Sequence, residues 1–213
     1  LSNILKNDLD ICICNYYIED LLEKKVAITK LNEYEIFNSK TFYKKMISDY
    51  FFGGYLWNKL IKKSLIDDIR FDETSSIMED MLFFSEMSAK LNKVCYVNQP
   101  LYHYIQREQS ALHIKNEKRI RNEIESMEKI MIKYSEIDIE SYLCLKFKYI
   151  FLLKKFLILN KLQKKDKNIY SNKLKKYMGI EIFKSNISIK EKVKLLMLFI
   201  FPFCYKMHDR RKK

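Results

Sequence analysis

The chain is poor in the residues that interrupt regular structure, with three Gly and two Pro among 213 residues. Turns with positive or fixed φ need these residue types, so the sequence excludes collagen-like, linker-rich and turn-repeat architectures. Apolar residues make up 48% of the chain, which is enough for a sizeable buried core and argues against disorder. We therefore expect a chain built mostly of helices and strands.

Sequence patterns for disulfide bonds, for a zinc site and for a membrane-spanning helix are also missing. The five Cys residues are scattered and odd in number, with no CxxC pair and no His at ligand spacing. This pattern indicates neither a disulfide framework nor a structural zinc site, and it fits a reducing cytoplasm. The longest uncharged apolar run covers the eleven residues from Leu195 to Tyr205. Such a run is too short for a transmembrane helix, and no secretory signal is recognisable.

The positive charge is unevenly distributed. Residues 1–113 contain 14 Lys and Arg against 16 Asp and Glu, whereas residues 114–213 contain 26 against 11. The sequence pattern changes at the same point, because helical periodicity dominates afterwards. We therefore place a boundary near residue 114, between a first unit at 1–113 and a basic α-helical region at 114–213. The excess of positive charge in residues 114–213 indicates an anionic partner, either nucleic acid or acidic lipid.

Hydrophobic periodicity and capping residues predict the individual elements. Strands are expected at 9–17, 25–30, 94–97 and 101–105, the last two separated by Pro100. Helices are expected at 39–48 with Asn38 or Ser39 as N-cap, and at 77–91 with a Ser76 and Glu79 capping box. Further helices are expected at about 117–134, 138–162, 167–178 and 189–208, the last kinked at Pro202. Between the first two helices, the adjacent Gly53 and Gly54 mark a tight turn or a close approach of the backbone.

Four sequence blocks of the first unit occur in a characteristic order. They read "GGYLWNKL", "IRFDETSSIMEDMLFFSEM", "VCYVNQPLYHY" and "REQS". Together they resemble the second half of a bacterial family 2 glycosyltransferase, over about residues 9 to 113. The resemblance implies an α/β fold, with a partial GT-A (Rossmann-like) catalytic domain followed by an α-helical C-terminal extension. It also implies an inverting enzyme that transfers a sugar from a nucleotide-diphosphate sugar to a cell-surface polysaccharide or a lipid-linked acceptor.

The acidic pair at 79–80 is the candidate catalytic centre. Inverting transfer needs a base that takes the proton of the attacking hydroxyl, and a carboxylate is the usual base. The resemblance implies that Asp80 is this base and that Glu79 orients the acceptor or neighbouring groups. Asp80 lies in the first turn of a predicted helix, where the helix dipole is expected to hold its pKa low. The alternative is that both carboxylates merely complement the dipole at a helix start.

The segment after the glycine pair is the candidate acceptor site. Trp57 is the only Trp of the chain, and an indole face is a natural platform for a sugar ring. Within the same block, Asn58 is suited to hydrogen bonds with sugar hydroxyls. The resemblance implies that Trp57, Asn58 and Lys59 together bind the acceptor. The alternatives are a Trp57 that belongs to the core and a Lys59 that is a solvated surface charge.

The resemblance also implies a donor clamp. Arg107 and Ser110 correspond to a loop in which a guanidinium neutralises the leaving diphosphate and a hydroxyl adds a hydrogen bond. The alternative is a solvated Arg beside a helix cap. Two histidines lie nearby: we expect His103 to be half-buried in a strand, whereas His113 is a weaker candidate for phosphate or metal contact.

Enzymes of this family hold a divalent metal, Mn or Mg, through an Asp-x-Asp motif that precedes these blocks. The ligands of that metal are absent from this chain, because Asp8-Leu-Asp10 has the letters of the motif in the wrong context. Residues 1–7 resemble the end of the helix that follows the motif. We therefore expect the chain to be a fragment of such an enzyme, with little or no transfer activity alone.

The basic half shows no catalytic constellation. Its last segment, 189–213, places an apolar run between basic residues, which suits a helix lying on an anionic membrane surface. The alternative is a helix packed on the core with a solvated basic tail. Nucleic-acid binding is not expected, because the aromatic residues lie inside apolar helices and Lys outnumbers Arg. The chain is thus predicted to be a cytoplasmic enzyme, peripheral at the membrane, or else a non-enzymatic module that binds membranes or polyanions.

Overall fold

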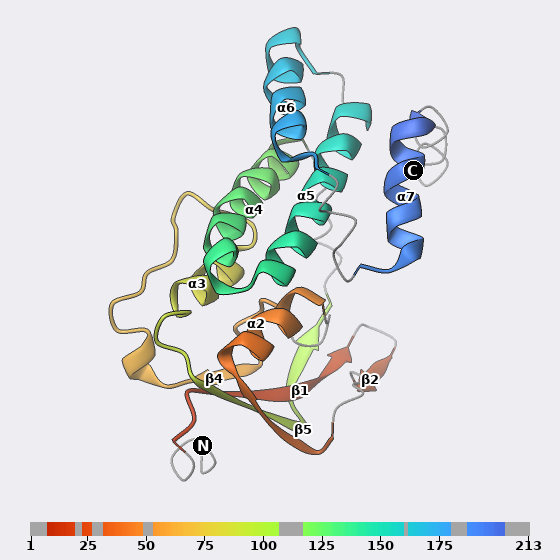
Figure 1. Ribbon diagram of the computed structural model, residues 1–213. Coiled ribbons are helices and arrows are strands. Elements are labelled where there is room, and N and C mark those ends of the chain that lie inside the picture. Colours follow the sequence, from red (N-terminus) through yellow and green to blue (C-terminus); the bar gives the residue numbers. More distant parts are fainter. Residues whose placement is uncertain are drawn as a thin grey trace.

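The computed structural model describes residues 8–19, 23–26, 32–48, 53–106, 117–159, 162–179 and 187–202. In these residues a mixed five-stranded sheet lies on one side and the helices cover one of its faces (Figure 1). The strands are β1 Ile11–Glu19, β2 Lys24–Val26, β3 Tyr34–Asn38, β4 Lys59–Ile61 and β5 Lys93–Ile105. The helices are α2 Ser39–Ser48, α3 Glu79–Glu86, α4 Glu117–Ile137, α5 Ile139–Leu159, α6 Lys164–Tyr177 and α7 Ile189–Ile200, with a short 3₁₀ turn at Lys63–Leu65. The expected α/β class is confirmed.

Strand β1 organises the sheet. It pairs in parallel with β5 on one side, and antiparallel with β2 and β4 on the other. The edge strand β3 then pairs antiparallel with β5, giving the order β2-β1-β5-β3. Along β1, Ile11 and Ile13 point into the core and are fully buried. Alternate side chains of a strand point to the same face, and here that face is covered by helices. The strand expected at 9–17 is confirmed as β1, and the described start of the strand expected at 25–30 pairs antiparallel with it as β2. Residues 27–30 lie outside the described residues.

Pro100 does not separate two strands as expected, because β5 runs without a break from Lys93 to Ile105. Two features explain this difference. The register of β5 against β1 shifts on both sides of Asn15, the residue opposite Pro100. The pairing of β5 with β3 already ends at Val97, so no hydrogen bond to β3 is required of Pro100. A proline is tolerated at such a bulge without ending the strand.

The helices of the first unit confirm one expected cap and contradict the other. Helix α2 begins as predicted, and the Asn38 Oδ1 accepts a hydrogen bond from the Thr41 N–H at 2.9 Å. Helix α3 is shorter than predicted and starts after Met78, whose φ of 63° is left-handed and which provides no side-chain cap. The Ser76 and Glu79 capping box was therefore wrong. The Ser76 hydroxyl instead accepts a hydrogen bond from Asn122 of α4 at 2.7 Å.

The helices of the second half lie where periodicity placed them, and α4 and α5 pack against each other and onto α2 and α3 (Figure 1). Buried residues from both halves share one core: Phe42, Tyr43 and Phe84 on one side, and Tyr134, Tyr149 and Leu153 on the other. Helix α7 ends at Ile200 rather than continuing through a kink at Pro202, since the residue before a proline disfavours helical geometry. The expected stretch beyond residue 202 lies outside the described residues. No helix in the described part of the chain is both long and apolar enough to cross a membrane.

Candidate active site

The candidate site is built around the start of α3. Glu79 and Asp80 occupy the first turn of this helix, as the sequence predicted. Met78, directly before them, holds the left-handed conformation that non-glycine residues rarely adopt, at a cost of about 1 kcal/mol or more. Such strain clusters at functional sites.

The glycine pair brings the "GGYLWNKL" segment against this helix. A Cβ on Gly54 would lie 2.9 Å from the Cβ of Met81, so only glycine allows the backbone to pass so close to α3. Gly53 has a positive φ of 20°. The close approach predicted from the two glycines is therefore confirmed. As a result, the backbone N–H of Leu56 points at the Asp80 carboxylate, with a donor-acceptor distance of 3.4 Å.

The environment of Asp80 shifts its acidity in the direction opposite to the one expected. Burial raises the pKa of the Asp80 carboxyl above its ordinary value, and the neighbouring charge of Glu79 raises it further. The Leu56 N–H and the charge of Lys59 act against this shift without cancelling it. The expectation that the helix dipole would hold this pKa low was therefore wrong, because desolvation in a half-buried position outweighs the dipole.

Lys59 is turned inward toward this site. Its ammonium donates hydrogen bonds to the Tyr55 carbonyl at 2.6 Å, the Asn58 Oδ1 at 2.8 Å and the Gly53 carbonyl at 3.1 Å. Burial lowers the pKa of Lys59 to about 7, while the Asp80 carboxylate pulls it upward. These contacts tie both ends of the segment together and place a cation within electrostatic range of Asp80.

Asn58 is also committed to the interior. It is only 2% exposed, and its side-chain amide donates a hydrogen bond to the Cys14 carbonyl at 3.2 Å. The Cys14 backbone N–H in turn donates to the Asn58 carbonyl at 3.0 Å. The side chain therefore fastens the segment to β1, and it presents no free amide to a ligand.

Trp57 lies in a cluster of aromatic rings. Its ring stacks with those of Tyr102, Tyr104 and Tyr55, with centroid distances of 4.7, 5.1 and 5.3 Å and interplanar angles below 30°. Tyr16 meets it edge-on at 4.8 Å. The indole is half-buried, and Tyr102 is exposed. Tyr102 and Tyr104 were not predicted as site residues, although their spacing of two along a strand signals that they share one face.

The remaining candidate site residues are those of the donor loop and the two histidines. Arg107, Ser110 and His113 lie outside the described residues. His103 lies in β5, but it is exposed rather than half-buried: its Nδ1 is 2.7 Å from a Glu19 carboxylate oxygen. Its ring packs on Tyr17, with centroids 4.8 Å apart.

The two aspartates of Asp8-Leu-Asp10 are not arranged as a metal site. One oxygen of Asp10 accepts the backbone N–H groups of Asn92 and Lys93 at 2.7 and 3.0 Å, which locks the start of β5 to the start of β1. Asp8 pairs instead with Lys62 at 2.8 Å. Among the residues that the structure describes, no group of three potential ligands is placed to hold a metal ion.

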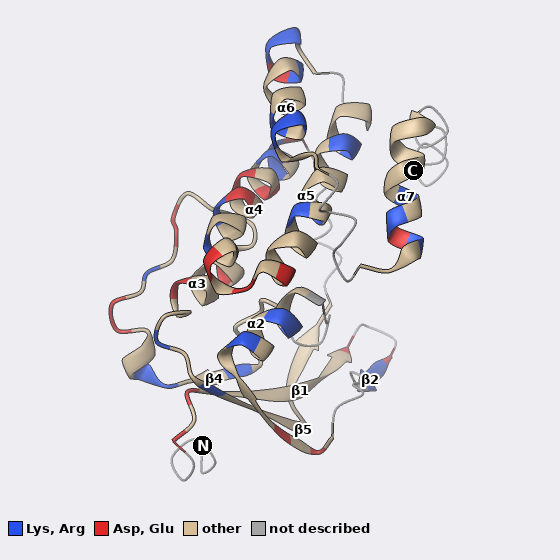
Figure 2. Ribbon diagram, in the orientation of Figure 1, with Lys and Arg blue, Asp and Glu red and all other residues tan. Residues whose placement is uncertain are grey.

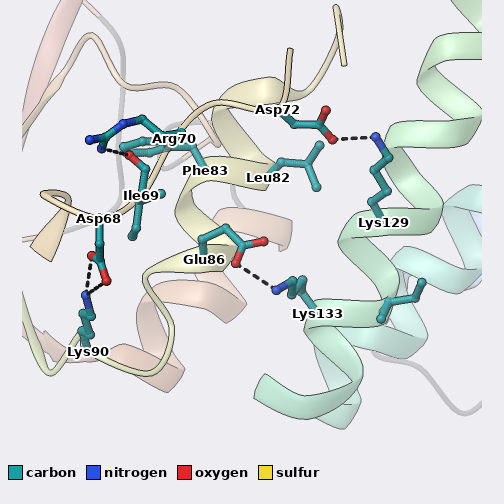
Figure 3. Close-up of a pocket in the computed structure, with 11 residues that line it drawn as sticks. Asp68, Ile69, Arg70, Asp72, Leu82, Phe83, Glu86, Lys90, Lys129 and Lys133 are labelled. Carbon is teal, nitrogen blue, oxygen red and sulfur yellow. Dashed lines mark hydrogen bonds and ion pairs between the residues drawn. The ribbon is translucent and has the colours of Figure 1, made fainter. Parts of the chain in front are cut away.

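A cavity of about 530 Å³ lies on another face of α3, between the 68–72 loop and α4 (Figure 3). Ion pairs cross or border it: Asp72 with Lys129 at 2.5 Å, Glu86 with Lys133 at 2.9 Å and Asp68 with Lys90 at 2.5 Å. Asp80 and Trp57 are not part of its lining. Because these three lysines and three carboxylates are already paired, and Arg70 donates to backbone carbonyls, this cavity is less suited to a charged ligand than its size suggests.

Comparison with known proteins adds no relative. Neither protein-family models nor curated protein sequences give a match to this chain. The chemistry of the Asp80 site therefore has to be argued from its own geometry.

Proposed function

We propose that residues 1–113 form the acceptor-side half of an inverting glycosyltransferase domain of the GT-A type. The enzyme would transfer a sugar from a nucleotide-diphosphate sugar to a cell-surface polysaccharide or a lipid-linked acceptor, in the cytoplasm. One observation carries this proposal: the Asp80 carboxylate, with a raised pKa, projects from a strained helix start beside the segment that bears Trp57. A raised pKa at a half-buried carboxylate is typical of a general base.

Asp80 would act directly on the acceptor. In the single displacement, the acceptor oxygen forms a bond to the anomeric carbon while the bond from that carbon to the diphosphate oxygen breaks. The hydroxyl proton passes to Asp80, and the electron pair of the broken bond leaves with the nucleoside diphosphate. A carboxylate with a raised pKa takes this proton more readily than an ordinary one does. Glu79 keeps that pKa raised and orients the acceptor.

The aromatic cluster supports a saccharide acceptor. Trp57 stacks with Tyr102 and Tyr104 and directly follows Leu56, whose N–H faces the Asp80 carboxylate. The C–H faces of sugars pack well on such aromatic surfaces. Asn58 and Lys59 are positioning residues in this proposal, because their side chains hold the segment rather than face a ligand. The acceptor would thus meet the exposed Tyr102 ring at the edge of the cluster, with Trp57 stacked behind it and the segment held by Asn58 and Lys59.

The donor side rests on the sequence resemblance alone. Arg107 and Ser110 would clamp the diphosphate, with His113 as a further candidate for phosphate or metal contact. A Mn or Mg ion is part of the family pattern, but Asp8 and Asp10 do not fit it, since their carboxylates are engaged with Lys62 and with the start of β5. No step is therefore assigned to a metal held by the described residues.

Saccharide binding can be tested directly, because Trp57 is the only Trp. Titration of the chain with a panel of oligosaccharides should change the Trp57 emission. Tyr102→Ala should weaken that response by up to about tenfold, as expected for the loss of a stacking ring worth up to roughly 1.5 kcal/mol. Phe71→Ala is the matched control, since Phe71 is an exposed aromatic that stacks on Phe83. A panel without any response, or equal effects of the two variants, would argue against the acceptor platform.

The alternative is a non-enzymatic module that binds membranes or polyanions. The basic charge of residues 114–213 favours it, and in that case Glu79, Asp80 and Trp57 are structural. The two functions differ in one respect: only the enzyme loses its activity when the Asp80 carboxylate becomes an amide.

A further inference from the structure

The two faces of α7 differ in what covers them. Leu195 and Leu198 are buried, and Leu195 packs with Phe147 and Ile150 of α5. At 100° per residue, the opposite face carries a stripe of five apolar side chains. These residues are between 45% and 80% exposed: Ile189, Val193, Leu196, Met197 and Ile200. Helix α7 lies beside α5 (Figure 1). In the described part of the chain, one side of α7 is thus packed and the other side is apolar and exposed.

Lysines border this apolar stripe on both sides. At 100° per residue, Lys190 and Lys194 lie along one edge of the stripe and Lys192 lies along the other. Among the described residues none of the three forms an ion pair. Figure 2 shows these basic positions along the first half of α7. The single carboxylate of the helix, Glu191, lies on the packed side, where its backbone N–H is capped by the Ser188 hydroxyl at 3.3 Å.

We infer that the outer face of α7 is a docking surface for an anionic lipid bilayer. An apolar stripe flanked by cations on both sides matches the interface, where side chains enter the acyl boundary and ammonium groups reach the phosphates. The surrounding region reinforces the attraction, because residues 114–213 hold 26 Lys and Arg against 11 Asp and Glu. With α5 behind it, the helix is held ready to lie flat on the surface.

Other occupants fit this surface less well. A second copy of the chain would bring lysines against lysines, in a protein with a net charge of +13, and like charges at an interface are costly. A nucleic acid would meet a strip of aliphatic side chains where its phosphates need cations. The bilayer alone satisfies both the apolar centre and the basic borders.

Vesicle sedimentation with the 213-residue chain tests this inference. We expect binding to vesicles of equal parts phosphatidylcholine and phosphatidylglycerol, and much weaker binding to phosphatidylcholine alone. Inverting the charge of Lys190, Lys192 and Lys194 to Glu should weaken binding to the anionic vesicles by about a hundredfold, at roughly fivefold for each position near the surface. The matched control inverts Lys164, Lys165 and Lys167 of α6, with the same change of net charge, and should cost less than about tenfold.

The apolar stripe has its own pair of variants. Ile200→Asp should abolish vesicle binding, whereas Ile169→Asp on α6 should leave it close to native. Both side chains are exposed, so we expect both variants to fold, and circular dichroism checks this. Three outcomes would overturn the inference: no binding to anionic vesicles, equal losses in the two lysine triples, or native binding by Ile200→Asp. A duplex DNA that binds as tightly as the vesicles and responds equally to all variants would also overturn it, in favour of diffuse polyanion binding.

Discussion

Asp80 and Lys59 show how individual residues acquire unusual properties from their surroundings. Burial disfavours the charged form of both groups, so it raises the pKa of Asp80 and lowers the pKa of Lys59. Each also favours the charged form of its neighbour. The pair therefore has a built-in coupling that sequence spacing alone does not reveal, because it depends on the glycine turn that brings residue 59 to the start of α3.

This coupling predicts a linked titration. In the native protein, Lys59 should release its proton near pH 7, well below its ordinary value of 10.5. Asp80→Asn should move that pKa lower still, because the attraction of the carboxylate is lost, whereas Asp68→Asn, at a carboxylate paired with Lys90, should not. The chemical shift of the labelled Lys59 Cε measures it. An unchanged Lys59 pKa in Asp80→Asn would show that the two groups do not interact.

The lowered pKa of Lys59 also determines the direction in which stability changes with pH. The folded-state pKa of Lys59 is below its unfolded value, so between pH 7 and pH 10.5 the unfolded chain binds more protons. The contribution of Lys59 to the free energy of unfolding therefore rises with pH across this window. Below pH 7 the cost of burying the cation is present in full.

At the scale of elements, the sequence predicted most locations and missed several boundaries. Periodicity and capping placed α2, α4, α5, α6 and α7, since each buries apolar side chains. Two misses, at Ser76 and Pro100, come from contacts distant in sequence: Ser76 bonds to Asn122 of α4, and Pro100 lies opposite a register shift in β1. A third is the end of α7, which stops at Ile200. Local chemistry cannot anticipate a partner that only the tertiary fold supplies.

The cap that was predicted correctly offers a clean measurement. Asn38→Ala should lower the free energy of unfolding by about 1 kcal/mol, because the first turn of α2 loses the acceptor of the Thr41 N–H. Asn38→Asp keeps an acceptor oxygen and should be close to native. Urea denaturation of the two variants decides the matter: equal stabilities would mean that the cap contributes nothing.

The candidate site was only partly predictable. Glu79 and Asp80 lie in the first turn of α3, where a helix start was predicted, and Trp57 directly follows Leu56, whose N–H faces Asp80. By contrast, the inward orientation of Asn58 and Lys59 and the participation of Tyr102 and Tyr104 follow from the pairing of β1 with β4 and β5. Which side chain faces a ligand and which one holds the backbone is decided by that pairing, and no local pattern encodes it.

At the scale of the molecule, the boundary near residue 114 divides charge but not the core. Tyr43 of α2 packs edge-to-face on Tyr134 of α4 with ring centroids 5.8 Å apart, and the Lys148 ammonium of α5 donates to the Ile47 carbonyl at 2.7 Å. The basic half therefore covers the first half, in addition to presenting α7 outward.

A shared core predicts a single unfolding transition. Trp57 emission reports on the first half, while far-ultraviolet circular dichroism is dominated by the helices that follow residue 117. We expect both signals to change with the same urea midpoint, because neither half keeps its core when the other unfolds. Two separated midpoints would show that the halves are independent domains.

The most direct test of the proposed chemistry is the rate of sugar transfer by the active protein that contains residues 1–213, compared with its Asp80→Asn variant. The account predicts a loss of at least about a hundredfold, the usual contribution of a general base, with Trp57 emission and vesicle binding unchanged. In the native enzyme the rate should rise with pH through a midpoint above the ordinary aspartate value of 3.8, since Asp80 must be ionised to accept the proton. A variant that transfers sugar at the native rate would contradict the account.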